Sequence, residues 1–319
     1  MKTKKKKNPI VKRSKAFFPI AIWCLILAWC LLFLFLVAWG LMTSFKSKFG
    51  FDWNSYGIPP FYIEFDVQIT DTIVAQVKEK AWAFDNYIVA FKNLWVLDKS
   101  GNQVFFGKML IFTLYYCIVY AFVAVVAPML CSYVYTKYSK RVPWVKAVWI
   151  LVLISMYVPL SASLAASLKL AMELGIYDNI FLFVIASFGP FGGDFLIYYA
   201  IWKGLSWEYA EAAFMDGASH WTVLIKVMFP MTITVFWVLF VTKIIALWTD
   251  YSTPMVFLPS YPTLAYGVYR LQQNTTNLET AGVPIRLAAL FAIAVPMFTL
   301  FMVFKEKMMG SLTMGGLKG

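Results

Sequence analysis

Six long apolar stretches, separated by polar segments, set the pattern of the chain. Several run uncharged for the roughly 18 residues or more that a helix needs to cross the hydrocarbon core of a bilayer. The pattern therefore predicts an all-α polytopic membrane protein with six transmembrane helices. The expected spans are residues 17–43, 109–135, 147–168, 180–202, 227–247 and 287–304.

The first span follows a basic segment, as the apolar core of a secretory signal peptide does. Its 27 uncharged residues are too many for a signal that is cleaved, and no small-residue cleavage site closes it. We expect this span to remain in the protein as a signal anchor.

The positions of Lys and Arg predict the orientation of the spans. If the N-terminus is cytoplasmic, the cytoplasmic segments contain 17 of the 28 basic residues, and the two short outer loops contain only Lys169, Arg270 and Arg286. Basic residues concentrate on the cytoplasmic side of membrane proteins. An N-in/C-in topology is therefore favoured, with residues 1–16 as a basic cytoplasmic N-terminus and 305–319 as a cytoplasmic tail.

The remaining segments divide into an outer insert and a membrane core. Residues 44–108 form an extended extracellular loop that is rich in aromatic residues and has seven Lys against seven acidic residues. This balance predicts a small packed domain, with a turn-rich stretch at 49–60 and a short helix within 69–83. Residues 109–304 form the five-helix core, which includes a cytoplasmic loop at 203–230. A short helix is expected at Leu264–Gln273 in the later outer loop.

Composition and charge exclude several classes of protein. The chain is 61% hydrophobic and 14% charged, whereas soluble domains have about 45–50% apolar and about 25% charged residues. Eight of the 28 basic residues that give the net charge of +12 lie in the first 15 residues. A basic segment before an apolar helix is typical of an anchor on an anionic lipid surface, so we expect the lipid bilayer and no nucleic acid as a partner.

Cysteine and histidine give no metal or disulfide pattern. All four cysteines lie inside apolar spans without metal-ligand spacing, and His220 is the single histidine. Neither a zinc site nor a disulfide framework is predicted.

The loop at 203–230 has the strongest local pattern. Ser206 is a good N-cap, and Glu208 lies in the first turn of a helix expected at 207–215, where the helix dipole favours an anion. Gly217 permits the left-handed conformation that ends a helix, and Ser219 can cap a second, amphipathic helix that runs to Pro230. The sequence therefore predicts a cytoplasmic helical hairpin that leads back into the membrane.

At these residues the chain resembles the permease subunits of binding-protein-dependent ABC importers. Their cytoplasmic loop has the pattern E-A-A, three residues, G, nine residues, I-x-L-P. The matching positions are Glu211, Ala212, Ala213, Gly217 and Pro230. Val227 and Phe229 replace the usual Ile and Leu, which keeps these positions apolar.

The C-terminal residues 311–319 are similar to the tail of MalG-type subunits of carbohydrate importers, with Ser311 and Leu317 as departures. The resemblance covers the second to sixth spans and the tail. It implies that the tail reaches between the ATPase subunits through Thr313, Gly315, Gly316 and Lys318.

The resemblance also implies a division of labour between subunits. The chain has no phosphate loop of the form G-x-x-x-x-G-K-[ST], so ATP and Mg²⁺ would be used by a separate ATPase dimer and no cofactor would bind here. The coupling contacts to that ATPase would come from Glu208, Glu211, Ala212, Ala213, Gly217 and Pro230. A second permease subunit, an extracellular solute-binding protein and a sugar substrate are the other implied partners, in a bacterial cytoplasmic membrane.

Asp194 and Lys243 are the clearest charges at membrane depth, where each costs about 2.5–3.5 kcal/mol at a helix centre. Asp194 follows the sequence 189–193, Gly-Pro-Phe-Gly-Gly, which can break the fourth span and expose carbonyl groups to a polar cavity. One interpretation is a substrate path lined by Asp194, Trp237, Thr242, Lys243, Trp248 and Asp250. The other is a structural Asp194 and Lys243 ion pair, with the tryptophans as residues of the membrane interface.

Two further functional hypotheses stay open from the sequence. One is a permease for peptides or another polar solute. The other is a membrane-embedded enzyme or sensor, for which Asp194 and Lys243 would supply the chemistry.

Overall fold

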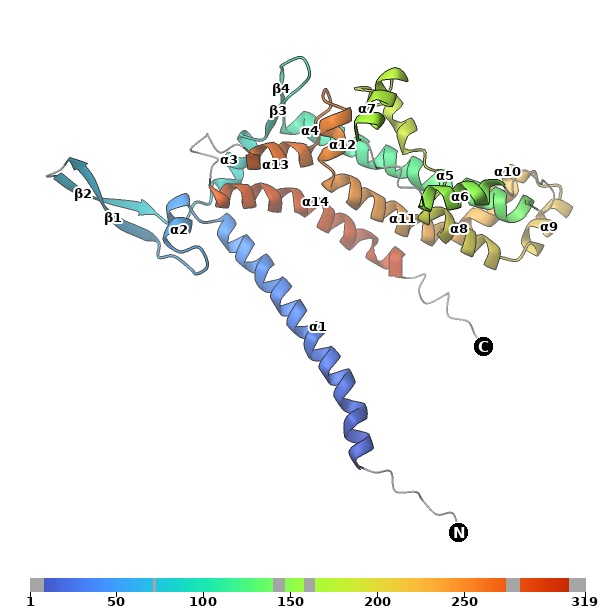
Figure 1. Cartoon of the computed structure of the whole chain (residues 1–319), viewed down its shortest axis with the longest axis horizontal. Coiled ribbons are helices and arrows are strands. Elements are labelled where there is room, and N and C mark those ends of the chain that lie inside the picture. Colours follow the sequence, from blue (N-terminus) through green and yellow to red (C-terminus); the bar gives the residue numbers. More distant parts are fainter. Residues whose placement is uncertain (1–8, 71–72, 140–146, 158–163, 274–281, 310–319) are drawn as a thin grey trace, which may run out of the picture. The chain divides into compact units, whose positions relative to one another are not determined.

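The computed structural model describes residues 9–70, 73–139, 147–157, 164–273 and 282–309. The chain forms two compact units. The first consists of Met1–Phe91 and Thr275–Phe291, and the second of Lys92–Asn274 and Ala292–Gly319. Figure 1 shows the elements of both.

The first unit joins a long apolar helix to a small mixed domain. Its elements are α1 (Pro9–Ser44), α2 (Lys48–Trp53), β1 (Tyr62–Thr70), β2 (Ile73–Lys80), α3 (Asn86–Lys92) and residues 283–291 of α14 (Val283–Met309). Strands β1 and β2 form an antiparallel hairpin in which Tyr62 pairs with Lys80.

The hairpin corrects two expectations. The segment 69–83 contains a strand instead of the expected short helix, and the fold is mostly helical but not all-α. The sequence from Thr70 to Val77 contains Thr, Ile and Val residues, and such β-branched side chains favour a pleated strand over a helix.

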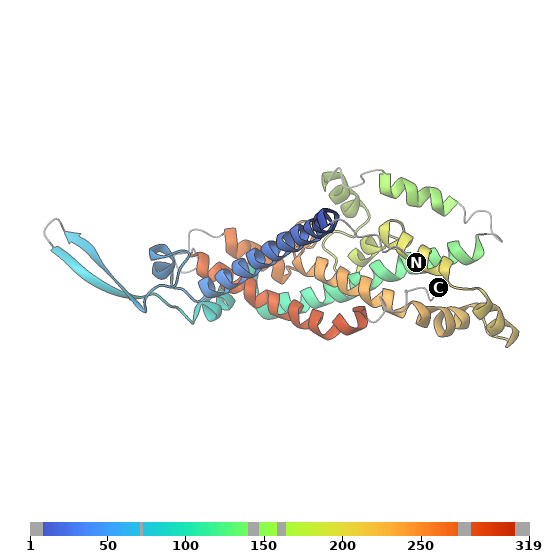
Figure 2. The same cartoon turned by 90° about the horizontal axis from the view of Figure 1, so that it is seen from below.

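The second unit is a helical bundle with one small strand pair. Its first elements are β3 (Trp95–Leu97), β4 (Gln103–Phe105), α4 (Phe106–Tyr115), the π-helix η1 (Tyr116–Tyr120), α5 (Ala121–Tyr138), α6 (Ala147–Tyr157), α7 (Leu164–Glu173), the 3-10 helix η4 (Leu182–Ser187) and α8 (Gly193–Gly204). The chain continues through α9 (Glu208–Met215), α10 (His220–Thr222), the π-helix η5 (Val223–Met228), α11 (Phe229–Thr249), α12 (Ser252–Phe257) and α13 (Leu264–Gln273). Helix α5 packs against α8 and α11, as Figure 1 and Figure 2 both show. The expected helix α13 is confirmed.

Four helices among the described residues are long and apolar enough to cross a membrane. They are Phe18–Ser44, Phe106–Tyr138, His220–Thr249 and Val283–Glu306, and they correspond to the first, second, fifth and sixth expected spans. The third expected span contains α6 and the start of α7, and residues 158–163 between them lie outside the described residues. The count of six spans therefore stays a prediction.

The fourth expected span is not one continuous helix. Helix η4 ends at Ser187 and α8 begins at Gly193, with the breaker sequence between them. Gly192 has a φ of +133°, a conformation that residues with a Cβ rarely adopt. Pro190 has no N–H to donate to a helix, so the break follows directly from the sequence.

Lys46 is the polar centre of the first unit. Its side chain is fully buried, and its Nζ donates to the carbonyl oxygens of Asn54 at 2.8 Å, Ser55 at 3.3 Å and Gly57 at 2.7 Å. Asn86 donates to the Lys46 carbonyl oxygen at 2.7 Å and so ties α3 to the same point. Burial lowers the pKa of the Lys46 ammonium group, while the three carbonyl acceptors satisfy its three donors.

Helix α2 lies close against Ala81, the residue that follows β2. A Cβ at Gly50 would collide with the Ala81 carbonyl oxygen, so only glycine permits this approach. The Ser47 hydroxyl accepts the Gly50 N–H at 3.0 Å and caps the helix. The glycine contact and the cap together fix α2 beside the base of β1 and β2.

Lys46→Met should destabilise the first unit by about 3 kcal/mol, because it leaves carbonyl oxygens in the fold without their donor. Protease cleavage within residues 44–91 of the full chain in detergent should then be roughly a hundredfold faster, since cleavage of the opened state follows the opening equilibrium. Lys80→Met, which removes an exposed lysine from the same unit, is the control. Equal cleavage rates for the two variants would contradict this role of Lys46.

Candidate functional site

Helices α9 and α10 form the hairpin that the sequence predicts. Helix α9 begins at Glu208, one residue later than expected, and the Ser206 hydroxyl accepts the Glu208 N–H at 3.2 Å. Gly217 has a φ of +79°, and its N–H donates to the Phe214 carbonyl oxygen at 3.0 Å. The Ser219 hydroxyl accepts the Thr222 N–H at 3.2 Å and caps α10. The expected left-handed turn and the second cap are therefore confirmed.

The second helix of the hairpin is predicted to end at Pro230, but it continues beyond this residue. It runs through η5 into α11 as one apolar helix of 30 residues, His220–Thr249. Pro230 lies inside this continuous helix and removes one hydrogen-bond donor from it, and the wider π-helix η5 ends two residues before it. The hairpin is thus continuous with a membrane span.

The inner face of the hairpin packs on the bundle. Ala210, Val223 and Met228 are fully buried in a core cluster with Trp202 of α8 and Val125 of α5. This cluster joins the hairpin to two helices of the second unit.

Polar and aromatic contacts tie the base of the hairpin to the end of α5. The Tyr138 hydroxyl and His220 Nδ1 share a hydrogen bond of 2.8 Å, and Lys137 Nζ donates to the Leu205 carbonyl oxygen at 2.7 Å. The Trp207 ring packs edge-on against Tyr138. Sequence reasoning missed this role of Tyr138 and His220, because they are 82 residues apart and no local pattern links them.

The outer face of the hairpin combines acidic and apolar side chains. Met215 is 89%, Trp221 68% and Ile225 59% exposed. Glu208, Glu211 and Ala212 are also exposed, Ala213 is half-buried, and neither glutamate forms an ion pair within the described part of the chain. Large exposed apolar side chains next to unpaired charges are typical of a surface that binds another protein.

A charged pocket lies where α8 begins. Lys243 Nζ of α11 is 2.8 Å from Asp194 Oδ2, and both side chains remain partly exposed. The pocket has a volume of about 270 Å³, and its lining residues are Ala124, Gly189, Phe191, Gly192, Gly193, Asp194 and Lys243. Asp194 lies in the first turn of α8, where the helix dipole stabilises its charge.

The other four residues of the expected path do not line this pocket. Trp248 is buried and donates to the Ile293 carbonyl oxygen at 3.2 Å, and Thr242 donates to the Val238 carbonyl oxygen at 2.8 Å. Asp250 Oδ2 accepts the Tyr116 hydroxyl at 3.0 Å, and its Oδ1 accepts the Thr253 N–H at 3.1 Å. Trp237 packs among aromatic rings. The structure brings Asp194 and Lys243 together, and a path through all six residues stays a prediction.

The tail residues Thr313, Gly315, Gly316 and Lys318 lie outside the described residues. Their expected contact with an ATPase stays a prediction.

Comparison with known proteins identifies the family. No family model matches the chain. The maltodextrin transport system permease protein MdxG of Bacillus subtilis is 30% identical over 196 residues, which cover 60% of this chain and 68% of MdxG. The chain belongs to the permease subunits of carbohydrate ABC transporters.

Other carbohydrate transport permeases are also similar to this chain in sequence. The arabinooligosaccharides transport system permease protein AraQ of Bacillus subtilis is 27% identical over 54% of this chain and 60% of AraQ. The diacetylchitobiose uptake system permease protein NgcG of Streptomyces coelicolor is 20% identical over 91% of this chain and 86% of NgcG. These relatives are transport components, so the permease is not an enzyme.

The fold agrees with this family. A crystal structure of a bacterial ABC transporter involved in the import of the acidic polysaccharide alginate has a chain that superposes with a TM-score of 0.68. The match covers 95% of the permease and 99% of that chain at 18% identity, so it shows the fold alone.

Gly217→Ala should loosen the hairpin of the permease, because an L-residue at a φ of +79° costs about 1–2 kcal/mol. Amide hydrogen exchange at residues 208–222 should then be about five to thirty times faster. Gly204→Ala is the matched control, since Gly204 is also exposed and an added Cβ there would meet no neighbouring atom. Equal exchange in the two variants would show that Gly217 does not hold the turn.

Proposed function

We propose that the permease is the membrane subunit of an ATP-driven importer for sugars or oligosaccharides in a bacterial cytoplasmic membrane. The observation that carries the proposal is the exposed hairpin with its E-A-A and Gly217 spacing, in a chain related to carbohydrate permeases. MdxG, AraQ and NgcG are named for maltodextrin, arabinooligosaccharide and diacetylchitobiose transport, which favours a carbohydrate over a peptide.

The hairpin is the proposed docking site for an ATPase subunit. Its exposed Met215 and Trp221 would fill a groove, and Glu211 would pair with a basic residue of the ATPase. ATP and Mg²⁺ would be bound by the ATPase dimer alone. Closure of that dimer would push the hairpin, and the buried cluster around Trp202 would pass the motion to α5 and α8 as a rigid body.

The importer would need further subunits. A second permease subunit would complete the membrane pathway, and an extracellular solute-binding protein would deliver the sugar. The hairpin and the tail residues 305–319 would face the cytoplasm in the N-in/C-in topology with six spans. The positions of Lys and Arg in the sequence support this orientation.

The Asp194 and Lys243 pocket is the proposed part of the sugar path. Backbone that leaves a helix at membrane depth is tolerated where it lines a polar cavity, and the break before α8 opens on this pocket. The carboxylate and the ammonium group can accept and donate hydrogen bonds to sugar hydroxyls.

Glu211→Lys should release the ATPase without preventing membrane insertion, because it places a positive charge against the basic residue that Glu211 would meet. Loss of such a pair typically costs 2–5 kcal/mol, so co-purification of the ATPase with the tagged permease should fall by at least about thirtyfold. Glu173→Lys, which reverses an exposed carboxylate on α7, is the control. Undiminished recovery of the ATPase with Glu211→Lys would refute the docking role.

Lys243→Met should destabilise the permease more than the double variant Asp194→Asn with Lys243→Met. The single variant leaves a carboxylate at membrane depth without its partner, whereas the double variant removes both charges. We expect the double variant to regain most of the lost thermal stability in detergent but to transport sugar poorly, because the polar groups of the pocket are gone. Normal uptake by the stable double variant would show that the pair is structural only.

A further inference from the structure

The loop between α2 and β1 turns back toward the membrane span that precedes it. The indole Nε1 of Trp39, within α1, donates to the Ser55 carbonyl oxygen at 2.9 Å. The rings of Trp39 and Tyr56 are in contact, with centroids 6.3 Å apart. The chain therefore leaves α1, forms α2 and returns to lie beside the end of α1, as Figure 1 shows.

This return is fixed by hydrogen bonds. The Lys46 ammonium group holds the carbonyl groups of Asn54, Ser55 and Gly57, and Asn54 Oδ1 accepts the Gly57 N–H at 2.7 Å. Three residues of the loop are thus held against the helix end by the buried Lys46 ammonium group and a local turn. These hydrogen bonds fix the position of the loop beside α1.

The depth of the loop follows from helix geometry. Trp39 lies five residues before the end of α1 at Ser44, which corresponds to about 7.5 Å along the helix axis. The apolar window of the span Phe18–Ser44 has no buried residue within this chain. The loop consequently lies level with the last turns of a helix that crosses the membrane.

Three large apolar side chains of this loop are exposed. Tyr56 is 79%, Ile58 76% and Phe61 78% exposed, and Trp53 at the end of α2 is also exposed. We call Trp53, Tyr56, Ile58 and Phe61 the aromatic collar. Exposed aromatic and apolar side chains do not stabilise a loop that lies in water. At the level of this loop they are stabilised in the interface between headgroups and acyl chains.

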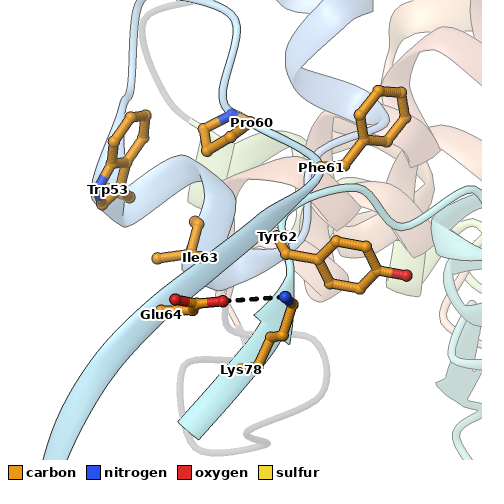
Figure 3. Close-up of a pocket in the computed structure, with 7 residues that line it drawn as sticks. All are labelled: Trp53, Pro60, Phe61, Tyr62, Ile63, Glu64 and Lys78. Carbon is orange, nitrogen blue, oxygen red and sulfur yellow. Dashed lines mark hydrogen bonds and ion pairs between the residues drawn. The ribbon is translucent and has the colours of Figure 1, made fainter. Parts of the chain in front are cut away.

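The chain becomes polar immediately after the collar. Glu64 Oε1 and Lys78 Nζ pair at 2.9 Å across β1 and β2, and Lys78 Nζ lies 5.0 Å from the centroid of the Tyr62 ring. Figure 3 shows Trp53, Pro60 and Ile63 on one side of this strand and the charged pair beside them, around a pocket of about 540 Å³. Along the chain, the apolar collar is followed by the charged β1 and β2 hairpin, in the same order as acyl chains are followed by water on leaving a membrane.

We propose that the aromatic collar inserts into the lipid headgroup region at the C-terminal end of α1. The partner is the lipid surface itself, and the β1 and β2 hairpin stands in water beyond it. A solute-binding protein would then have the hairpin available for contact but not the loop from Trp53 to Phe61. The inference rests on α1 being a membrane span and does not depend on the nature of the transported solute.

Nitroxide labels on single cysteines test the collar. The background is the full chain with Cys24, Cys30, Cys117 and Cys131 replaced by Ala, purified with the subunits that accompany it and reconstituted in nanodiscs of phosphatidylethanolamine and phosphatidylglycerol. Ile58→Cys and Phe61→Cys carry the label in the collar. Phe35→Cys on the exposed face of α1 is the lipid reference, and Ser100→Cys in the β3 and β4 turn is the water reference.

The depth of each label in the membrane sets how often it collides with oxygen and how often it collides with a water-soluble nickel chelate. We expect both collar labels to collide with the nickel chelate several-fold less than the Ser100 label, and with oxygen nearly as often as the Phe35 label. A collar label that behaves like the Ser100 label lies in water and overturns the proposal. A label shielded from both reagents is covered by protein, which also overturns it. Ile58 and Phe61 are largely exposed, so neither substitution removes a packing contact needed for folding.

Discussion

The hydrocarbon core of a bilayer offers no hydrogen-bond partner to the backbone, and this constraint governs the second unit. The segments Phe106–Tyr138 and His220–Thr249 remain helical over 33 and 30 residues, although Pro128 and Pro230 each remove a donor. In His220–Thr249 the π-helix η5 ends two residues before Pro230, and its wider turn redistributes the backbone hydrogen bonds there, whereas η1 ends at Tyr120, eight residues before Pro128. Where the helix is broken instead, at residues 188–192, the freed backbone lies at the pocket of Asp194 and Lys243.

The hairpin of α9 and α10 is packed firmly on one face and exposed on the other. Small Ala210 and the apolar residues of η5 fit against Trp202, while the outward Met215 and Trp221 remain uncovered within this chain. The hydrogen bond between Tyr138 and His220 closes the base. A hairpin with a flexible base would absorb the movement of a partner, whereas a hairpin held at its base would pass that movement to the bundle, as the proposed coupling role requires.

The sequence predicts those parts of the structure that depend on residues close together in the chain. The turn at Gly217, the cap at Ser219 and the helix Leu264–Gln273 depend on neighbours within a few residues, and they are confirmed. The segment 69–83, which contains β2, is predicted as a short helix but forms a strand, because charged residues such as Lys78 and Lys80 mask its β-branched pattern. Contacts such as Tyr138 with His220, or Lys46 with the loop after α2, join residues whose meeting depends on the whole fold. No local pattern could show them.

The partial exposure of the Asp194 and Lys243 pair fits its proposed place in the sugar path. Sealing two charges from water strengthens their attraction but also costs both of them their hydration. Instead the two side chains keep 24% and 38% of their surface open to the pocket. Water at this point lowers the cost of holding both charges at membrane depth, but it also weakens their attraction to each other. Polar groups that are hydrated and only moderately attracted to each other can exchange partners at low cost, which is what a transient contact with a passing hydroxyl group requires.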